Sequence, residues 1–352
     1  MTERQDPVPQ GPRLSVLDFS PVVSGSGPGQ ALRDSVTVAE RVDRLGYLRY
    51  WIAEHHNAPN IASCSPPVLI DRIAAATTHM RIGSGGVMLP NHSPLVVAEQ
   101  FGTLEALHPG RIDMGIGRAS GTDPVTARAL RRTTGTDDFA ERFAELMGYF
   151  ATPADGSPVL PVTAVPAQGN RPPLWLLGSS PNSAQVAGML GLPFAFAHHF
   201  SPENTIPSLK AYRSAFTPSA DLERPYAIVA AIVIVADTDE HAEWLAGPMA
   251  LSSLLQRTTG ITGPYPSPEE AAAYPYTPQE RAYVAQRVDA HLIGGPEKVR
   301  AKMADFLDRT GADELMSVTL IHGPDDRVRS LELLAEIAAL PSHGVAVDPA
   351  SV

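Results

Sequence analysis

Short apolar runs alternate with amphipathic stretches along most of the chain. Eight apolar runs predict strands at residues 14–23, 47–53, 80–89, 111–116, 174–177, 193–197, 228–236 and 314–321. Stretches in which apolar residues recur at helical spacing predict helices at residues 30–45, 66–79, 94–107, 137–150, 182–190, 202–216, 239–255, 296–310 and 325–340. This alternation predicts a (β/α)₈ TIM barrel, and an open doubly wound sheet is the alternative fold.

Two stretches rich in proline, glycine and alanine interrupt the alternation, at residues 151–173 and 258–278. Because helices and strands resume after each stretch, we expect insertions in the loops of one domain that spans residues 14–340. Residues 1–13 are rich in Pro, Gln and Gly and are expected to form a disordered N-terminal tail. Residues 341–352 are expected to form a C-terminal tail.

The charge balance bears on the possible partners. The chain has 38 acidic and 27 basic residues, a net charge of −11, which argues against sequence-independent binding to nucleic acid or to an anionic membrane. The single cysteine, Cys64, excludes an internal disulfide and a multi-cysteine metal site. Since the sequence has neither a signal peptide nor an apolar run of membrane-spanning length, we expect a soluble, cytoplasmic protein.

Histidines are concentrated directly after the predicted strands, where TIM barrels carry their active sites. Six of the 11 histidines lie there: His55, His56, His92, His198, His199 and His322. Neighbours on a strand face opposite sides, so His55 and His56 should not bind one ion, and the HExxH metal motif is absent. We therefore expect no metal. One histidine could act as general acid or base in the pocket, or it could make only a structural hydrogen bond.

A possible anion site follows the strand at residues 174–177. There the chain passes from a strand into a helix through small and polar residues: Gly178, Ser179, Ser180, Pro181, Asn182 and Ser183. Unpaired backbone N–H groups, the helix dipole and the Ser and Asn side chains would together bind a phosphate. The same residues could instead form a plain helix N-cap.

Two further features occur at the ends of predicted strands. Arg118 follows the strand at residues 111–116, where it could bind a phosphate through two hydrogen bonds or form a surface ion pair. Gly83, Gly85 and Gly86 lie within one strand, which indicates either the close approach of a flat ligand or a bulge. The GxGxxG-like matches are incomplete, so we expect no nicotinamide site, and the absence of a GxSxG elbow makes a hydrolase a distant alternative.

Several segments in this order resemble the bacterial-luciferase-like flavin oxidoreductases. They are AEHH (53–56), IGSGGVMLP (82–90), GRIDMGIGR (110–118), LLGSS (176–180), GLPFAFA (191–197) and GADELM (311–316). The resemblance extends over about residues 14–340, and it is the order and spacing of these motifs together that make it specific.

The resemblance implies a TIM barrel that binds FMN at the C-terminal ends of its strands. It implies that His55 is the candidate proton-transfer residue and that a cis peptide bond joins Gly85 to Gly86 beside the flavin ring. The residues implied to hold the flavin phosphate are Arg118, Ser179, Ser180, Asn182 and Ser183, next to Gly178. Gly117 stands where the luciferases proper carry a reactive cysteine. This departure argues against light emission, and we hypothesise that it leaves room for a bulkier substrate.

The expected activity is that of a flavin-dependent monooxygenase, which uses reduced FMN from a separate reductase and O₂ to oxygenate a small organic substrate. A deazaflavin-dependent dehydrogenase and a non-catalytic flavin-binding protein are the alternatives. Family resemblance implies a homodimer that pairs through residues 66–79 and 94–107. The insertion at 258–278, with three nearby tyrosines, could be an active-site lid or a disordered loop.

Overall fold

The computed structural model describes residues 11–119, 123–131, 138–151 and 160–343. Eight strands form a closed, entirely parallel barrel, in which the last strand pairs with the first and with the strand at residues 227–235. These strands are β1 (Arg13–Asp18), β2 (Arg49–Ile52), β3 (Arg81–Ser84), β5 (Ile112–Gly117), β6 (Leu174–Gly178), β7 (Phe194–Ala197), β8 (Ala227–Val235) and β10 (Glu314–Val318). The predicted TIM barrel is confirmed.

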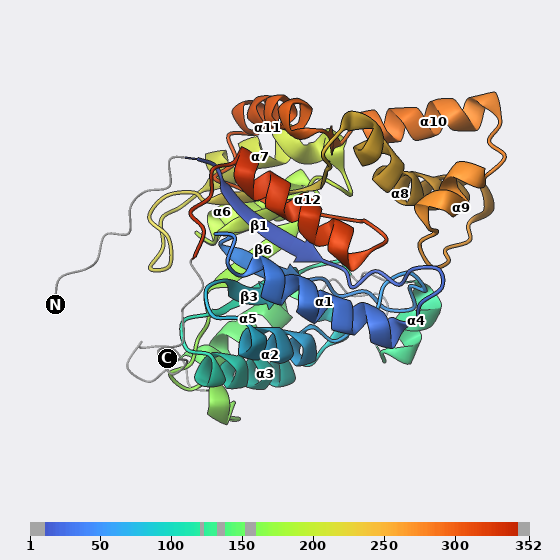
Figure 1. The fold of residues 1–352 in the computed structure, drawn as a ribbon. Helices are drawn as coiled ribbons and strands as arrows, with labels where there is room; N and C mark the ends of the chain where they lie inside the picture. Colours follow the sequence, from blue (N-terminus) through green and yellow to red (C-terminus); the bar gives the residue numbers. More distant parts are fainter. Residues whose placement is uncertain (1–10, 120–122, 132–137, 152–159, 344–352) are drawn as a thin grey trace, which may run out of the picture.

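Helices surround the barrel and bury its outer face (Figure 1). They are α1 (Pro28–Val42), α2 (Pro66–Ala76), α3 (Pro94–Leu107), α5 (Phe139–Phe150), α6 (Pro181–Met189), α7 (Thr205–Ala215), α8 (Asp239–Thr259), α11 (Pro296–Thr310) and α12 (Pro324–Ile337). Most begin with proline in the first turn, where its missing N–H leaves no hydrogen bond unmade. Short elements without a predicted counterpart are η1 (Leu89–Asn91) and α4 (Pro124–Ala129), and η4 (Pro202–Asn204) precedes α7.

Four predicted strands are clearly shorter than expected, among them β2, which spans Arg49–Ile52 rather than residues 47–53. β1 ends at Asp18, where the carboxylate accepts a hydrogen bond from the backbone N–H of Ser20 and Ser20 adopts a positive φ of 48°. The strand expected at residues 80–89 is divided at Gly85–Gly86 into β3 and the two-residue β4 (Val87–Met88). β10 ends at Val318. The helix expected from residue 137 begins at Phe139, and residue 137 is outside the described residues.

Within the insertion predicted at residues 258–278, residues 260–267 and 274–277 are non-helical and the rest belongs to helices. α8 continues to Thr259 and ends at Gly260 with φ +70°. α9 (Pro268–Ala273), α10 (Pro278–Asp289) and β9 (Leu292–Gly294) then follow, and α9 and α10 extend from one side of the barrel (Figure 1). Capping boxes start both helices, and Pro268 and Pro278 stand at their first positions. Of the first insertion, residues 160–173 contain only the short η3 (Val165–Ala167), as expected, and residues 152–159 are outside the described residues.

A buried ion network fills the barrel interior near the N-terminal ends of the strands. Arg49 donates to Asp113 at 2.8 Å and to Glu314 at 2.8 and 3.1 Å. All three side chains are buried, and Trp51 Nε1 also donates to Asp113 at 3.0 Å. Because this end of the barrel is filled, space for a ligand is left at the other end. No helix in the described part of the chain is long and apolar enough to cross a membrane.

Candidate active site

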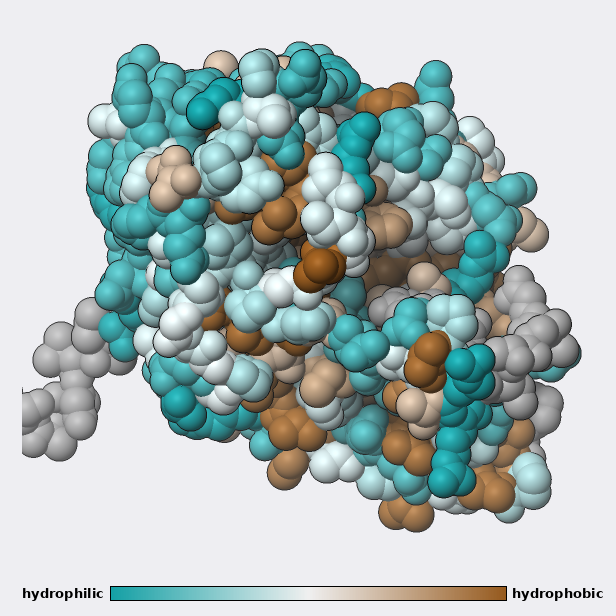
Figure 2. Space-filling view, turned by 90° about the vertical axis from the view of Figure 1, so that its right-hand side faces the viewer, coloured by the Kyte–Doolittle hydropathy of each residue, from teal (hydrophilic) through white to brown (hydrophobic). Residues whose placement is uncertain are grey.

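A cavity of about 300 Å³ opens where the strands end and the loops to the helices begin. The surface is hollowed on this side, with hydrophobic side chains visible in the hollow (Figure 2). All of the predicted site residues except Asn182 line this cavity: His55, Gly85, Gly86, Arg118, Gly178, Ser179, Ser180 and Ser183. Other lining residues include Leu17, Phe19, Trp51, Met88, Leu177, Phe196, His199, Phe200 and Met316. A mainly apolar cavity with a few convergent polar groups is typical of a ligand site.

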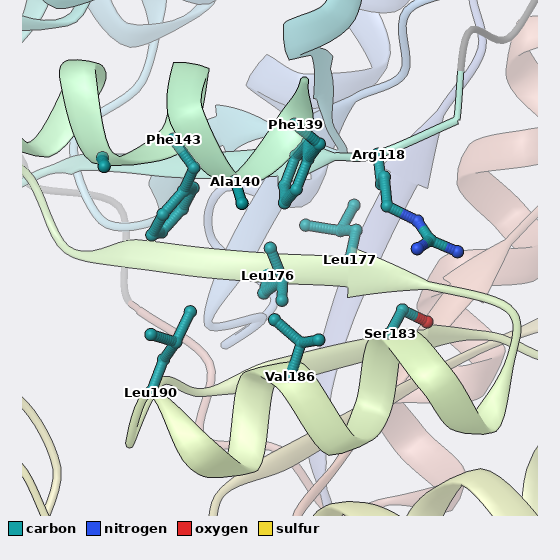
Figure 3. A pocket seen from close by; sticks show the side chains of 10 residues that line it. Arg118, Phe139, Ala140, Phe143, Leu176, Leu177, Ser183, Val186 and Leu190 are labelled. Atoms are coloured by element: carbon teal, nitrogen blue, oxygen red, sulfur yellow. The ribbon is translucent and has the colours of Figure 1, made fainter. Parts of the chain in front are cut away.

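One end of the cavity is polar and lies at the N-terminus of α6. Ser180 is the N-cap residue: its hydroxyl accepts from the backbone N–H of Ser183 at 3.4 Å, and Ser183 Oγ donates to the Ser180 carbonyl at 2.8 Å. Arg118, which directly follows β5, lies at the same end (Figure 3). Hydroxyl groups, a helix N-terminus and a guanidinium group together form a suitable site for a phosphate.

Asn182 does not belong to this group in the structure. Its side chain is exposed and does not line the cavity, although Ser183, its neighbour, does. Consecutive residues on a helix point in directions about 100° apart, so Ser183 can line the cavity while the Asn182 side chain does not. A role for Asn182 in phosphate binding stays a prediction.

The glycines form the wall expected for a flat ligand. The peptide bond between Gly85 and Gly86 is cis, as the family resemblance implies. A Cβ atom on Gly86 would lie 2.7 Å from the Gly115 carbonyl oxygen, and one on Gly117 would lie 3.0 Å from Met88 Sδ. Only glycine therefore lets β4 and β5 pack this closely while the cavity stays open beside them.

His55 follows β2 and lines the cavity beside Phe19, with their ring centroids 5.4 Å apart. Its Nδ1 is buried and has no hydrogen-bond partner among the described residues. Burial lowers the pKa of His55, although the charge of Glu54 partly opposes this shift. The imidazole is therefore neutral at pH 7 and can accept a proton from a bound ligand.

Glu54 and His56, on either side of His55, are not among the residues that line the cavity. The buried Glu54 carboxylate accepts from Nε2 of His56 at 2.9 Å, from Nε2 of His92 at 2.8 Å and from the Met88 backbone at 3.1 Å. Burial opposes ionisation of Glu54, but these hydrogen bonds and the neighbouring imidazoles lower its pKa. His55 and His56 do not converge, as predicted, whereas nothing in the sequence indicated that His56 and His92 meet at Glu54.

The ligand atoms of Glu54, His56 and His92 all lie within 4.8 Å of one another, a donor set that could also hold a divalent ion. The two imidazole contacts to the carboxylate are at ordinary hydrogen-bond length, and these hydrogen bonds account for the arrangement. The expectation of no metal remains a prediction.

The other histidines that follow strands have different surroundings. His199 lines the cavity, where Phe19 packs edge-on against it with ring centroids 5.9 Å apart. His198 is not among the lining residues: its Nδ1 lies 2.7 Å from the Thr205 hydroxyl, and its ring packs against Phe306. His322 Nε2 lies 3.3 Å from a backbone oxygen of the β1–α1 loop. The concentration of histidines therefore marks the correct end of the barrel, but only His55 and His199 reach the cavity among the six.

A second, apolar groove continues from the polar end of the cavity between α5 and α6. Arg118 and Ser183 lie together at one end of it, and apolar side chains line the rest (Figure 3). These are Phe139, Ala140, Phe143, Ala144, Leu176, Leu177, Val186 and Leu190. Nothing in the sequence pattern indicated this groove.

The family model described as luciferase-like monooxygenase matches residues 13–314. The chain belongs to the luciferase-like monooxygenase family. It is therefore an oxidoreductase. A Bacillus subtilis protein, YvbT, is 49% identical over 327 residues, covering 92% of this chain and 96% of that one. A luciferase-like monooxygenase of Escherichia coli K12 is 45% identical over 326 residues, with the same coverage.

Further comparisons show the range of chemistry on this fold. An N-acetyl-S-alkylcysteine monooxygenase of Bacillus subtilis is 31% identical over 332 residues, covering 92% of this chain and 97% of that one. The solved structure of apo-MsnO8 is 39% identical, has a TM-score of 0.86, and covers 96% of this chain and 100% of that one.

Two solved structures below 25% identity share the fold alone. One is the oxygenating constituent of a Pseudomonas putida 3,6-diketocamphane monooxygenase in complex with FMN, at 19% identity and a TM-score of 0.72, covering 94% of this chain and 98% of that one. The other is an F420-dependent secondary alcohol dehydrogenase, at 14% identity and a TM-score of 0.67, covering 95% of this chain and 100% of that one.

Proposed function

We propose that this protein is a monooxygenase that uses reduced FMN and O₂ to oxygenate a small organic substrate. The observation that carries this proposal is the cavity itself, which has hydroxyl groups, a helix N-terminus and Arg118 at one end and mainly apolar walls elsewhere. A flat, mostly apolar cofactor with one phosphate fits both parts. Monooxygenases among the relatives and solved structures support the same assignment.

The residues of the cavity have distinct roles in this proposal. Arg118, Ser180 and Ser183 would bind the phosphate, and Gly85 and Gly86 would allow the ring to approach the backbone closely. When bound, reduced FMN supplies the electrons that activate O₂. The apolar walls keep water away from the reacting atoms, and neutral His55 accepts a proton beside them.

The groove between α5 and α6 favours FMN over a deazaflavin cofactor. Deazaflavins of the F420 type carry several carboxylates beyond the phosphate. The groove that continues from the phosphate end is lined by apolar side chains, including Phe139, Phe143 and Val186, which offer no partner for a carboxylate. A hydride-transferring dehydrogenase remains a candidate because an F420-dependent enzyme shares this fold. The apolar groove places it second.

Two partners complete the proposal. Reduced FMN comes from a separate flavin reductase, because the sequence has no complete dinucleotide fingerprint. A second copy of the chain packs against α2 and α3, which expose the large apolar side chains of Val68 (71%), Val96 (44%) and Leu107 (63%). Light scattering on the wild type and on a Val68→Glu, Leu107→Glu variant tests this pairing: a dimer that becomes a monomer is expected, and a monomeric wild type contradicts it.

The function is tested by anaerobic titration of the purified protein with reduced FMN and, separately, with a reduced deazaflavin. Oxygen is then mixed in, and flavin absorbance is followed by stopped flow. We expect binding of reduced FMN and, after oxygen, a long-lived absorbing species distinct from reduced and oxidised flavin. Binding of the deazaflavin alone would overturn the proposed mechanism in favour of the dehydrogenase.

Matched variants connect this titration to the structure. Arg118→Gln should weaken FMN binding, because a hydrogen-bonded charge at the phosphate end is lost. Arg33→Gln is the control, since Arg33 lies on α1 and, within the described part of the chain, its side chain bonds to Gln30 alone. His55→Ala should bind FMN normally but fail to turn over. Full turnover by His55→Ala would instead indicate that His55 has no catalytic role.

A further inference from the structure

His199 is held in one orientation by the neighbouring strand. Both its backbone N–H and its Nδ1 lie 3.0 Å from the carbonyl oxygen of Ala230 on β8. A carbonyl oxygen can only accept a hydrogen bond, so Nδ1 must carry the proton. In a neutral imidazole the other nitrogen, Nε2, then has a free lone pair.

This lone pair is available to a ligand. Nε2 lies on the opposite edge of the ring from Nδ1, and it has no hydrogen-bond partner among the described residues. The ring itself lines the cavity. Burial lowers the pKa of His199 to about 4, and His198 and His55 add to this shift. At neutral pH the cavity wall therefore presents a hydrogen-bond acceptor rather than a cation.

Apolar residues line the cavity beside the His199 ring. Phe19 packs edge-on against the His199 ring, and Ala197 and Ala230 line the cavity nearby. Phe200 lines the same region with 78% of its surface exposed, so it is available to cover a bound molecule. Among the described residues that line the cavity, Arg118 is the one charged at neutral pH, and it lies at the phosphate end.

We propose that the substrate is an uncharged, largely apolar molecule that donates one hydrogen bond, from a hydroxyl or N–H group, to Nε2 of His199. The proposal rests on the proposed function, because it assigns the phosphate end to FMN and this part of the cavity to the substrate. A carboxylate in the same place would lose its hydration and meet an acceptor instead of a donor. His199 is thus a specificity-determining residue, distinct from His55.

The test uses three probes of similar shape: 4-ethylphenol, which is neutral and donates a hydrogen bond; 4-ethylanisole, which is neutral and does not; and 4-ethylbenzoate, which is an anion. Each is titrated calorimetrically into protein saturated with oxidised FMN at pH 7.5. We expect 4-ethylphenol to bind about tenfold more tightly than 4-ethylanisole, equivalent to about 1.4 kcal/mol, and 4-ethylbenzoate to bind most weakly. Equal binding of the three probes, or no binding of 4-ethylphenol, would overturn the proposal.

Variants at position 199 separate the acceptor from the fold. His199→Asn keeps an N–H donor near the Ala230 carbonyl but lacks an acceptor at the place of Nε2, so the preference for 4-ethylphenol should disappear. His199→Gln can return an amide oxygen to that place and should restore part of the preference. His198→Asn is the matched control and should behave as the wild type. A preference that survives in His199→Asn contradicts the proposal.

The outcome is separable from that of the proposed function. FMN affinity is measured first for every variant, and the apoprotein is titrated with the same probes. A protein that binds FMN but shows no preference among the probes refutes the role of His199 and leaves the flavin site intact. A protein that does not bind FMN refutes the proposed function, while the apoprotein titration still tests the preference of the cavity wall.

Discussion

Replacing Arg49 with methionine should strongly destabilise the barrel, although Arg49 is not among the residues that line the active-site cavity. The Arg49 guanidinium bonds to the carboxylates of Asp113 and Glu314, and both of these are fully buried. Methionine has a similar length and an apolar surface, so the main loss is the charge. Asp113 keeps Arg81 at 2.8 Å and Glu314 keeps the Tyr226 hydroxyl at 2.8 Å, but their shared cation is gone.

The size of this effect follows from the burial. Removing one partner from a buried ion pair costs about 3–5 kcal/mol, because an uncompensated charge stays in the interior. A chain of 352 residues has an unfolding entropy of about 0.7 kcal/mol/K at the midpoint. Arg49→Met should therefore lower Tm by about 4–7 °C. Differential scanning calorimetry measures the shift, and urea denaturation gives the free energy of unfolding independently.

Two comparisons make this prediction refutable. Arg329→Met removes an ion pair to Asp237 of the same 2.8 Å length, but Arg329 is 46% exposed, so a loss below about 1 kcal/mol is expected. A triple variant that adds Asp113→Asn and Glu314→Gln to Arg49→Met should recover much of the stability, because it removes the unpaired charges. If Arg49→Met is no less stable than Arg329→Met, or if the triple variant recovers nothing, the electrostatic reasoning is wrong.

Two further predictions concern the phosphate end and the acid stability of the fold. Gly178→Ala places a Cβ against Ser183 Oγ and should weaken FMN binding about ten- to hundredfold in a fluorescence titration. Gly263→Ala is the control and should leave FMN binding unchanged, because its Cβ would meet no atom within 4 Å. Asp18 has a lowered pKa: its burial opposes ionisation, but the charge of Arg327 and several hydrogen bonds outweigh it. The contribution of Asp18 to stability is therefore full above about pH 4 and is lost as pH falls further. The Asp18→Asn variant should be less stable than the wild type at pH 7 but should lose less free energy of unfolding on acidification. Urea denaturation at pH 7, 4 and 3 measures this difference.

The barrel could be predicted because its strands are buried on both faces and stand out as apolar runs. The strand positions also located the site, because residues that directly follow parallel strands meet at one end of the barrel. Proline and glycine mark residues 258–278 as an insertion but do not by themselves reveal the helices within it. The capping boxes at Ser267 and Thr277 were visible in the sequence and would have predicted α9 and α10.

The features that could not be predicted depend on the geometry of local turns and on contacts between distant residues. Local turns decide which way a side chain points after a strand: the positive φ of Ser20 follows Phe19, and one helical step separates Ser183 from the exposed Asn182. The pairing of His92 with Glu54 joins residues 38 positions apart.

The protonation of His199 shows why such contacts matter for function. A histidine after a strand can be a donor, an acceptor or a cation, and the residues around it in the sequence do not decide among these. The decision comes from the Ala230 carbonyl, which lies 31 positions away and fixes the proton on Nδ1. Strand pairing between β7 and β8 brings these two groups together. The chemical character of the proposed substrate site is thus set by the pairing of two neighbouring strands rather than by the motif that contains the histidine.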